Sequence, residues 1–174
     1  KKLEIDDAFQ KKLFLYCQKQ GVTFLSTPYD VKSAKFLNRF GVAAFKVASA
    51  DIVDLPLHEY IASTGKPSLI AVGMATLSEI ETVLKIYTRY NNPNLALLHC
   101  VSNYPASKAS LNLNVIRTLR DAFGTMVGYS DHSSDNTAAT VAAALGAKIF
   151  EKHFTLDTAM QGPDHKASAT PSEF

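Results

Sequence analysis

Residues 125–153, TMVGYSDHSSDNTAATVAAALGAKIFEKH, contain two short apolar runs that each end at a histidine, His132 and His153. A helical pattern of small residues lies between the runs and stops at Gly146. Strand, helix and strand joined by short links predict two parallel strands with a crossover helix. Because parallel strands end at one edge of their sheet, both imidazoles are expected at the same rim.

The same unit recurs along the chain. Between the apolar runs, helical patterns occupy residues 9–20, 31–40, 77–87, 115–123 and 138–145, and Thr76 with Glu79 forms a capping box at the start of the third. Nearly continuous apolar runs are typical of strands covered on both faces. Six runs of this kind are present, at residues 22–26, 44–49, 68–73, 95–101, 125–130 and 148–153.

This alternation predicts an α/β fold, and two architectures fit it: a doubly wound open sheet or part of a (β/α)8 TIM barrel. A glycine-rich phosphate loop, the usual mark of open nucleotide-binding sheets, does not occur. A complete barrel needs about 200 residues or more. Six parallel βα units would make a partial (β/α)8 barrel, three-quarters of a complete one, and both architectures stay open at this point.

The composition is that of a globular domain and gives no sign of a nucleic-acid-binding or membrane-spanning protein. The chain has 174 residues, of which 47% are hydrophobic, and a net charge of +2, which fit one globular domain and give no sign of a nucleic-acid surface. No apolar run is long enough for a membrane span. Cys17 and Cys100 are too few for a disulfide framework, so a reducing, cytoplasmic location is expected. The chain starts directly in a helical pattern and its last residues, PSEF, resemble a helix start, so both ends are expected to continue.

The residues at the predicted strand ends indicate a metal-assisted site. Two histidines suit a divalent cation with mixed nitrogen and oxygen ligands, such as Mn²⁺, although they could also be rim histidines with ordinary hydrogen bonds. Lys46 lies in an apolar run, where a lysine is costly unless it meets an anion, or unless it extends between sheet and helices. Ser49 and Ser130 are close enough in the pattern to share that anion, although Ser130 could instead cap a helix.

Five motifs, KVASAD (46–51), HCVSNYPA (99–106), GYSDH (128–132), EKHFTLD (151–157) and GPDHKAS (162–168), resemble the sialic acid synthase family. The resemblance covers essentially the whole chain. It implies a (β/α)8 barrel followed by a small antifreeze-like domain, with residues 1–174 forming a single-domain fragment that spans roughly the third to the eighth strand. Members condense phosphoenolpyruvate with an N-acylated amino sugar, and the resemblance implies a homodimeric full-length protein.

The resemblance also implies roles for single residues. His132 and His153 would bind the metal, expected to be Mn²⁺, with Mg²⁺ or Co²⁺ as alternatives. Lys46, Ser49 and Ser130 would hold phosphoenolpyruvate, while Ala71 replaces a family serine. The catalytic carboxylates would be Asp51 and Asp164, and the amino sugar would contact Ser102, Tyr104, Thr27 and Tyr29.

Several alternatives stay open. Asp51, Tyr104 and Asp164 could be ordinary loop residues, Asp131 could orient His132, and alternation sends either Glu151 or its neighbour inward. The expected sugar is N-acetylmannosamine, with legionaminic or pseudaminic acid precursors or a 6-phosphorylated sugar as alternatives. A non-catalytic binding module and a metal-dependent aldolase are the other classes that fit.

Overall fold

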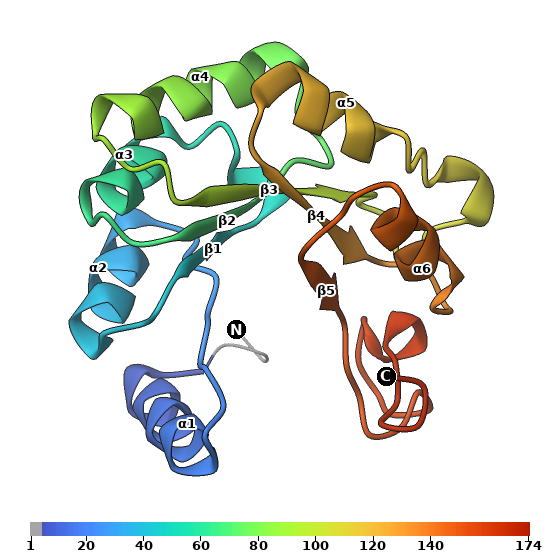
Figure 1. Ribbon diagram of the computed structural model, residues 1–174. Coiled ribbons are helices and arrows are strands. Elements are labelled where there is room, and N and C mark those ends of the chain that lie inside the picture. The colour runs from blue at the N-terminus through green and yellow to red at the C-terminus, as the bar shows by residue number, and fades with distance from the viewer. Residues whose placement is uncertain (1–4) are drawn as a thin grey trace.

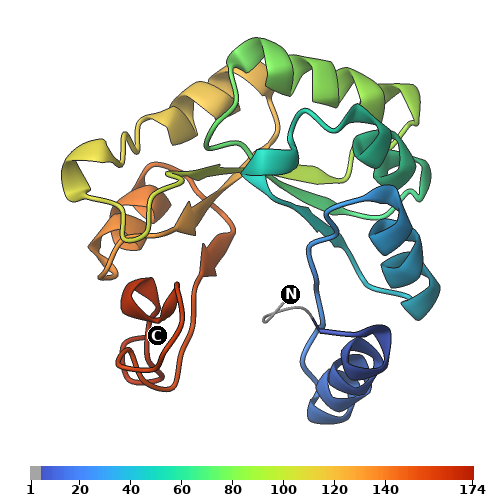
Figure 2. The same cartoon turned by 180° about the vertical axis from the view of Figure 1, so that it is seen from behind.

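The computed structural model describes residues 5–174. Its centre is one five-stranded parallel sheet whose strands follow their order in the chain. The sheet curls, and the helices that follow the strands lie along its convex side (Figures 1 and 2). The strands are β1 (Phe45–Val47), β2 (Ser68–Ala71), β3 (Leu95–Cys100), β4 (Met126–Asp131) and β5 (Phe150–Lys152).

The helices begin and end largely where their capping residues predict. Thr76 and Glu79 form the expected capping box at the start of α4, and Gly41 closes α2 in the left-handed conformation with φ of 77°. The α-helices of residues 5–174 are α1 (Asp7–Gln20), α2 (Val31–Phe40), α3 (Leu55–Ser63), α4 (Leu77–Arg89), α5 (Val115–Phe123) and α6 (Thr137–Ala144).

Helix α3 was missing from the predicted elements. It is nine residues long, and Asp54 caps it by accepting a hydrogen bond from the Leu57 backbone N–H. Pro56 stands in its first turn, a common position for proline. These two signals mark a helix start, and they were available in the sequence.

The two faces of the sheet differ in what covers them. Side chains such as Phe45, Ile70 and Leu97 on the convex side pack against the helices and form the main core. The concave side carries a smaller cluster around Ala71, Leu98 and Cys100. Side chains that continue this face at the carboxyl ends of the strands therefore also lie on the concave side.

The predicted strand at residues 22–26 is wrong. This segment belongs to no strand, and it makes no ladder with β1 or any other strand of residues 5–174. Val22 and Leu25 are exposed there. An extended segment becomes a strand only through ladder hydrogen bonds, so residues 5–174 contain five strands in place of six, and an α-helix follows each of the first four.

The fold class is nevertheless confirmed. Strand order that follows chain order, with helices α2–α6 on the convex side, is the arrangement of a (β/α)8 barrel, whereas a doubly wound sheet reverses its order and is covered on both faces. The chain forms a curled half-barrel. None of the helices in the described part of the chain has both the length and the hydrophobicity to cross a membrane.

Candidate active site

A polar cavity of about 520 Å³ opens at the carboxyl ends of the strands. Active sites of (β/α)8 enzymes lie at this end, because the loops after the strands converge there. Nine of the eleven residues singled out from the sequence line it: Thr27, Tyr29, Lys46, Ser49, Tyr104, Ser130, His132, His153 and Asp164.

The two histidines meet at this cavity. β4 and β5 pair in parallel with Asp131 opposite Lys152, so His132 and His153 each follow the last paired residue of their strand. Their ring centres are 5.6 Å apart at an interplanar angle of 67°. A metal bound to one nitrogen of each ring lies about 3 Å from each ring centre, so rings at this separation can share one ion.

Hydrogen bonding prepares His132 as a ligand. Its Nδ1 lies 2.7 Å from the carbonyl oxygen of Val101, which only accepts, so Nδ1 carries the proton. Nε2 then keeps its lone pair and lies 3.3 Å from Ser130 Oγ. Burial lowers the pKa of His132, and the neighbouring His153 lowers it further. A neutral imidazole fixed through its second nitrogen is the usual form of a metal-binding histidine.

The fit to a metal is partial. Asp164 Oδ2 lies 3.9 Å from His153 Nδ1, too far for a hydrogen bond, and residues 5–174 contain no cluster of three or more His, Cys, Asp or Glu arranged for a metal. Two imidazoles therefore supply two positions of a coordination sphere. Water and substrate oxygens are the natural occupants of the others for an ion such as Mn²⁺.

Tyr104 packs against both rings. Its ring centre is 4.1 Å from that of His132 and 5.4 Å from that of His153. The ring is half exposed, and burial raises the pKa of its hydroxyl. Tyr104 therefore forms a wall of the cavity beside the histidines.

Lys46 is a buried cation of the site. It is only 9% exposed, and its Nζ lies 3.3 Å from Glu151 Oε2. Ser49 begins a short 3-10 turn directly after β1, and its Oγ lies 3.2 Å from Ser102 Oγ. A buried ammonium together with a hydroxyl is a common way to hold a phosphate or carboxylate.

Asp51 and Ser102 do not line the cavity. The 3-10 turn Ser49–Asp51 breaks the alternation of β1, which carries the Asp51 carboxyl away from the mouth. Asp51 Oδ2 is buried without a hydrogen-bond partner in the described part of the chain. Burial raises the pKa of this carboxyl and Asp54 adds to the effect, while Lys46 opposes it.

The strand alternation left open by the sequence is resolved. Ser130, His132, Glu151 and His153 face the cavity, whereas Asp131 points to the opposite side of the sheet. Asp131 was a candidate for orienting His132, and it does not do so by a direct hydrogen bond: its carboxylate accepts hydrogen bonds from Ser133 and Lys152 instead. Adjacent residues of a strand point to opposite faces, which explains the separation.

Comparison with known proteins places the chain. The model of the NeuB family matches residues 1–174. The chain belongs to the NeuB family. It is 45% identical over 174 residues to an uncharacterized protein of Methanocaldococcus jannaschii, covering 100% of this chain and 52% of that protein. It is 44% identical to N,N'-diacetyllegionaminic acid synthase of Campylobacter jejuni, covering 99% of this chain and 52% of the synthase.

Solved structures of NeuB-family proteins agree with the fold. The crystal structure of N-acetylneuraminic acid synthetase from Leptospira borgpetersenii, in complex with citrate, superposes with a TM-score of 0.93 at 39% identity. The match covers 98% of this chain and 59% of that one. The chain thus spans about half the length of the curated relatives it matches.

Glu151 is the residue of this NeuB-family site that the sequence reasoning did not select. It lies two residues before His153, so a strand places both side chains on one face. That spacing was the available signal. Cys100 and Ala71 also line the cavity, and burial raises the pKa of the Cys100 thiol.

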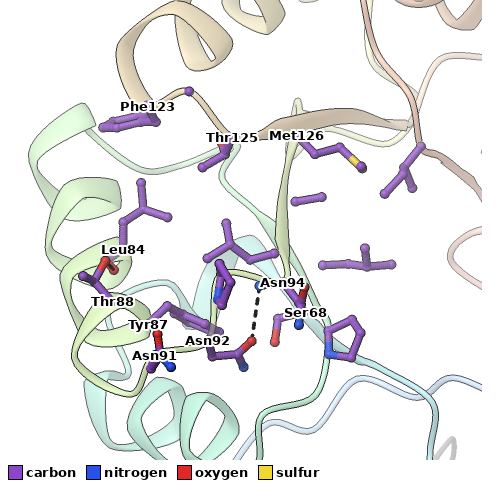
Figure 3. A pocket seen from close by; sticks show the side chains of 17 residues that line it. Ser68, Leu84, Tyr87, Thr88, Asn91, Asn92, Asn94, Phe123, Thr125 and Met126 are labelled. Atoms are coloured by element: carbon purple, nitrogen blue, oxygen red, sulfur yellow. Dashed lines mark hydrogen bonds between the residues drawn. The ribbon is translucent and has the colours of Figure 1, made fainter.

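A second cavity, of about 700 Å³, lies at the opposite end of the sheet (Figure 3). Its lining is apolar side chains with asparagines and other neutral polar groups, and includes no Asp, Glu, Lys, Arg or His. The amino-terminal end of a (β/α)8 barrel serves stability. The smaller, polar cavity is therefore the candidate active site.

Proposed function

We propose that this chain carries much of the active site of a synthase that condenses phosphoenolpyruvate with an N-acylated amino sugar and water to give a nine-carbon 2-keto acid and phosphate. The observation that carries the proposal is the pairing of chemistries in one cavity. A buried ammonium, Lys46, and two converging imidazoles, His132 and His153, line the same space. The ammonium suits an anion, and a cation bound by the two imidazoles would suit a sugar carbonyl oxygen.

Lys46, Ser49 and Ser130 are the proposed anion contacts. Lys46 and Ser49 come from β1 and the turn after it, and Ser130 from the end of β4, so a bound phosphate would be held from two sides. Charge-assisted hydrogen bonds from an ammonium are the strong ones in such sites. Ala71 offers no hydroxyl at the wall between them, and a water molecule can take that place.

His132 and His153 are the proposed metal ligands, with Mn²⁺ expected and Mg²⁺ or Co²⁺ as alternatives. A divalent cation there would supply Lewis-acid polarisation of the sugar aldehyde oxygen. Tyr104, Thr27 and Tyr29 shape the sugar side of the cavity, and Asp164 lies beside His153. Asp164 is the carboxylate proposed to position sugar hydroxyls and water, whereas Asp51 does not line this cavity.

In this proposal the protein contributes chiefly by positioning the two substrates. Holding the nucleophilic C3 of phosphoenolpyruvate against the aldehyde carbon converts a bimolecular step into one between bound groups. Water adds at C2 of the resulting oxocarbenium, and loss of phosphate leaves the keto acid. Fixed donors at the phosphate and at the developing alkoxide stabilise the charges that form.

N-acetylmannosamine is the first proposed acceptor, giving N-acetylneuraminate. Legionaminic and pseudaminic acid precursors and the 6-phosphate of N-acetylmannosamine are the alternatives, since the named relatives differ in their products. A cytoplasmic homodimer is the proposed form of the full-length protein. A non-catalytic binding module is the second candidate, favoured by Ala71 in place of a hydroxyl donor.

Phosphate release tests the proposal. The full-length protein is incubated with phosphoenolpyruvate, Mn²⁺ and each amino sugar in turn. We expect release with one sugar that depends on both substrates and is lost in Lys46→Met. Mn²⁺ binding without release from any amino sugar would support the binding module, and cleavage of a keto acid without phosphoenolpyruvate would support a metal-dependent aldolase.

A further inference from the structure

A buried ion pair lies directly behind the two histidines. Lys152 Nζ is 2.9 Å from Asp131 Oδ2, and the two side chains are 8% and 2% exposed. In the ladder between β4 and β5 these residues are register partners, and each immediately precedes a histidine of the cavity. The pair therefore joins the two strand ends at the last position before His132 and His153.

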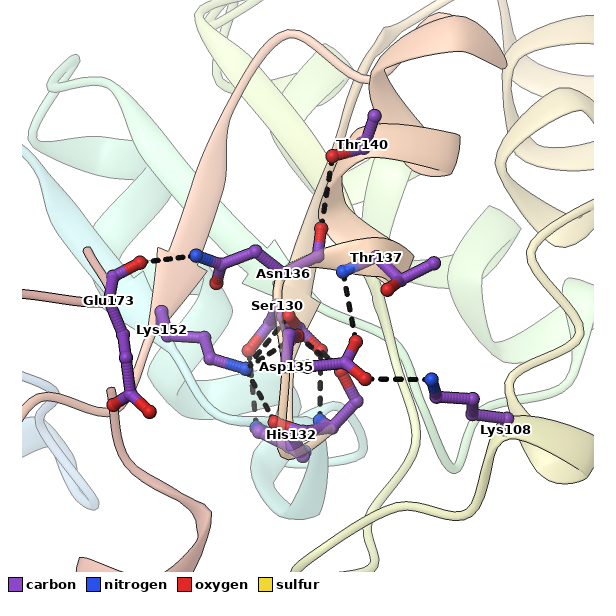
Figure 4. A network of polar contacts seen from close by, with 11 residues as sticks. Lys108, Ser130, His132, Asp135, Asn136, Thr137, Thr140, Lys152 and Glu173 are labelled. Atoms are coloured by element: carbon purple, nitrogen blue, oxygen red, sulfur yellow. Dashed lines mark hydrogen bonds and ion pairs between the residues drawn. The ribbon is translucent and has the colours of Figure 1, made fainter. Parts of the chain in front are cut away.

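The contacts of the pair extend into the loop after β4. Asp131 Oδ1 accepts hydrogen bonds from the backbone N–H and the hydroxyl of Ser133, at 2.8 and 2.7 Å. Lys152 Nζ also donates to the carbonyl oxygens of Ser133 and Asp135 (Figure 4). Both charged groups are thus fully engaged, and the loop that leaves His132 is tied to β5.

Stability alone does not explain this arrangement. A buried ion pair is often no more stabilising than apolar side chains of similar size, because desolvating two charges is costly. Its attested benefit is to specify one register among alternatives. β5 is three residues long and has only three paired positions with β4, so its register rests on few ladder bonds.

We propose that Asp131 and Lys152 are positioning residues for the histidine pair. The ion pair holds the ends of β4 and β5 in register, and this keeps His132 and His153 close enough to bind one cation. The inference rests on the proposed metal site and adds two residues to it. Neither side chain is a proposed ligand: Lys152 lies in the wall of the cavity, but its Nζ is bonded to Asp131 Oδ2 and to the carbonyl oxygen of Ser133.

Two variants that leave buried charges of opposite sign distinguish a positioning role from a direct electrostatic effect on the cation. Asp131→Asn leaves a buried positive charge near the site, and Lys152→Met leaves a buried negative one. A through-space field predicts weaker cation binding in the first and tighter binding in the second. Positioning predicts weaker binding in both, by about tenfold or more, as for other residues that orient metal ligands.

The experiment titrates the full-length protein with Mn²⁺ alone and measures the dissociation constant. Circular dichroism gives the folded fraction of each variant, and the concentration of binding sites is corrected for it. Lys85→Met is the matched control, because it removes an exposed lysine paired with Glu81 on α4. The affinity for inorganic phosphate is measured in parallel. We expect it to stay within twofold in Asp131→Asn and Lys152→Met, whereas general unfolding would reduce it as well.

If a single variant fails to fold, the double variant Asp131→Asn/Lys152→Met leaves no unpaired buried charge and takes its place. We expect the double variant to bind Mn²⁺ at least about tenfold more weakly than the parent. Folded variants that bind Mn²⁺ within twofold of the parent, or more tightly in Lys152→Met, overturn the positioning role alone. A parent protein that binds no Mn²⁺ overturns the proposed metal site, and the positioning role with it.

Discussion

Lys46 and Glu151 form an ion pair inside the cavity, with 3.3 Å between Nζ and Oε2. Glu151 comes from β5, on the same face as His153, and Lys46 comes from β1 across the concave side. The carboxylate occupies the contact that an anionic substrate would need. Binding of the proposed anionic substrate would therefore compete with this ion pair for one ammonium group.

Glu151→Gln is expected to tighten the binding of inorganic phosphate by up to about fivefold. The glutamate is 43% exposed, so the lost pair corresponds to roughly 1 kcal/mol at most. Isothermal titration at constant ionic strength measures the change, with Glu81→Gln on α4 as the control. Unchanged or weaker phosphate binding in Glu151→Gln would show that the two groups do not compete.

His153→Ala is expected to weaken Mn²⁺ binding by more than about 100-fold, because it removes one of the two imidazoles proposed to bind the ion. Electron paramagnetic resonance of free Mn²⁺ gives the dissociation constant. His165→Ala is the control, since His165 contacts Thr155 and does not line the cavity. Equal affinities in the two variants would refute the histidine site.

Gly128→Ala is expected to reduce the free energy of unfolding by about 1–3 kcal/mol. A Cβ at Gly128 would lie 2.5 Å from Leu98 Cδ2 and 2.6 Å from the backbone oxygen of Ile149, and the backbone atom cannot move aside. Gly124→Ala is the comparison, because a Cβ there has free space but φ is 62°. Urea unfolding compares the two, and Gly128→Ala as stable as the parent would contradict the close approach.

His58 makes stability depend on pH. It is fully buried in α3, neither ring nitrogen has a hydrogen-bond partner in the described chain, and burial lowers its pKa to about 4. The unfolded chain takes up a proton near pH 6.5, which the folded protein cannot do until about pH 4. The free energy of unfolding is therefore highest above the unfolded pKa of about 6.5, and it falls as the pH drops toward 4.

Between pH 7 and 5 this linkage removes about 2 kcal/mol of unfolding free energy. Urea midpoints at the two pH values measure the loss, and His58→Leu should reduce it by most of that amount. His99 is a second buried histidine whose pKa is lowered by burial, so some pH dependence stays in the variant. An unchanged pH dependence in His58→Leu would contradict the assignment.

The sequence predicted the parts of the fold that depend on local pattern. The runs that form β1 to β5 and the capping box of α4 follow from residue spacing, and the rim position of His132 and His153 follows from parallel strands. Residues 22–26 have the apolar pattern of a strand but pair with no other strand of the described chain. The spacing of apolar residues does not predict whether a pairing strand is present. Strand formation there depends on the rest of the sheet.

The site was predicted as a set of residues at strand ends, and its geometry was not. The direction of Glu151 follows from its spacing of two residues to His153 once a strand through both is assumed, but its contact with Lys46 joins β5 to β1 and no local pattern reports it. Asp51 leaves the cavity because a 3-10 turn follows β1. The ion pair of Asp131 with Lys152 joins residues 21 positions apart, and only the register of the two strands brings them together.

The central claim is that a carbon–carbon bond forms between phosphoenolpyruvate and the amino sugar at this cavity. The most direct test is to supply phosphoenolpyruvate labelled with carbon-13 at C3, the amino sugar and Mn²⁺ to the full-length protein, and to follow the label by NMR. The account predicts that the label becomes a methylene carbon bonded to the former aldehyde carbon of the sugar. Label recovered only in phosphoenolpyruvate or pyruvate, with every N-acylated amino sugar supplied, would contradict it.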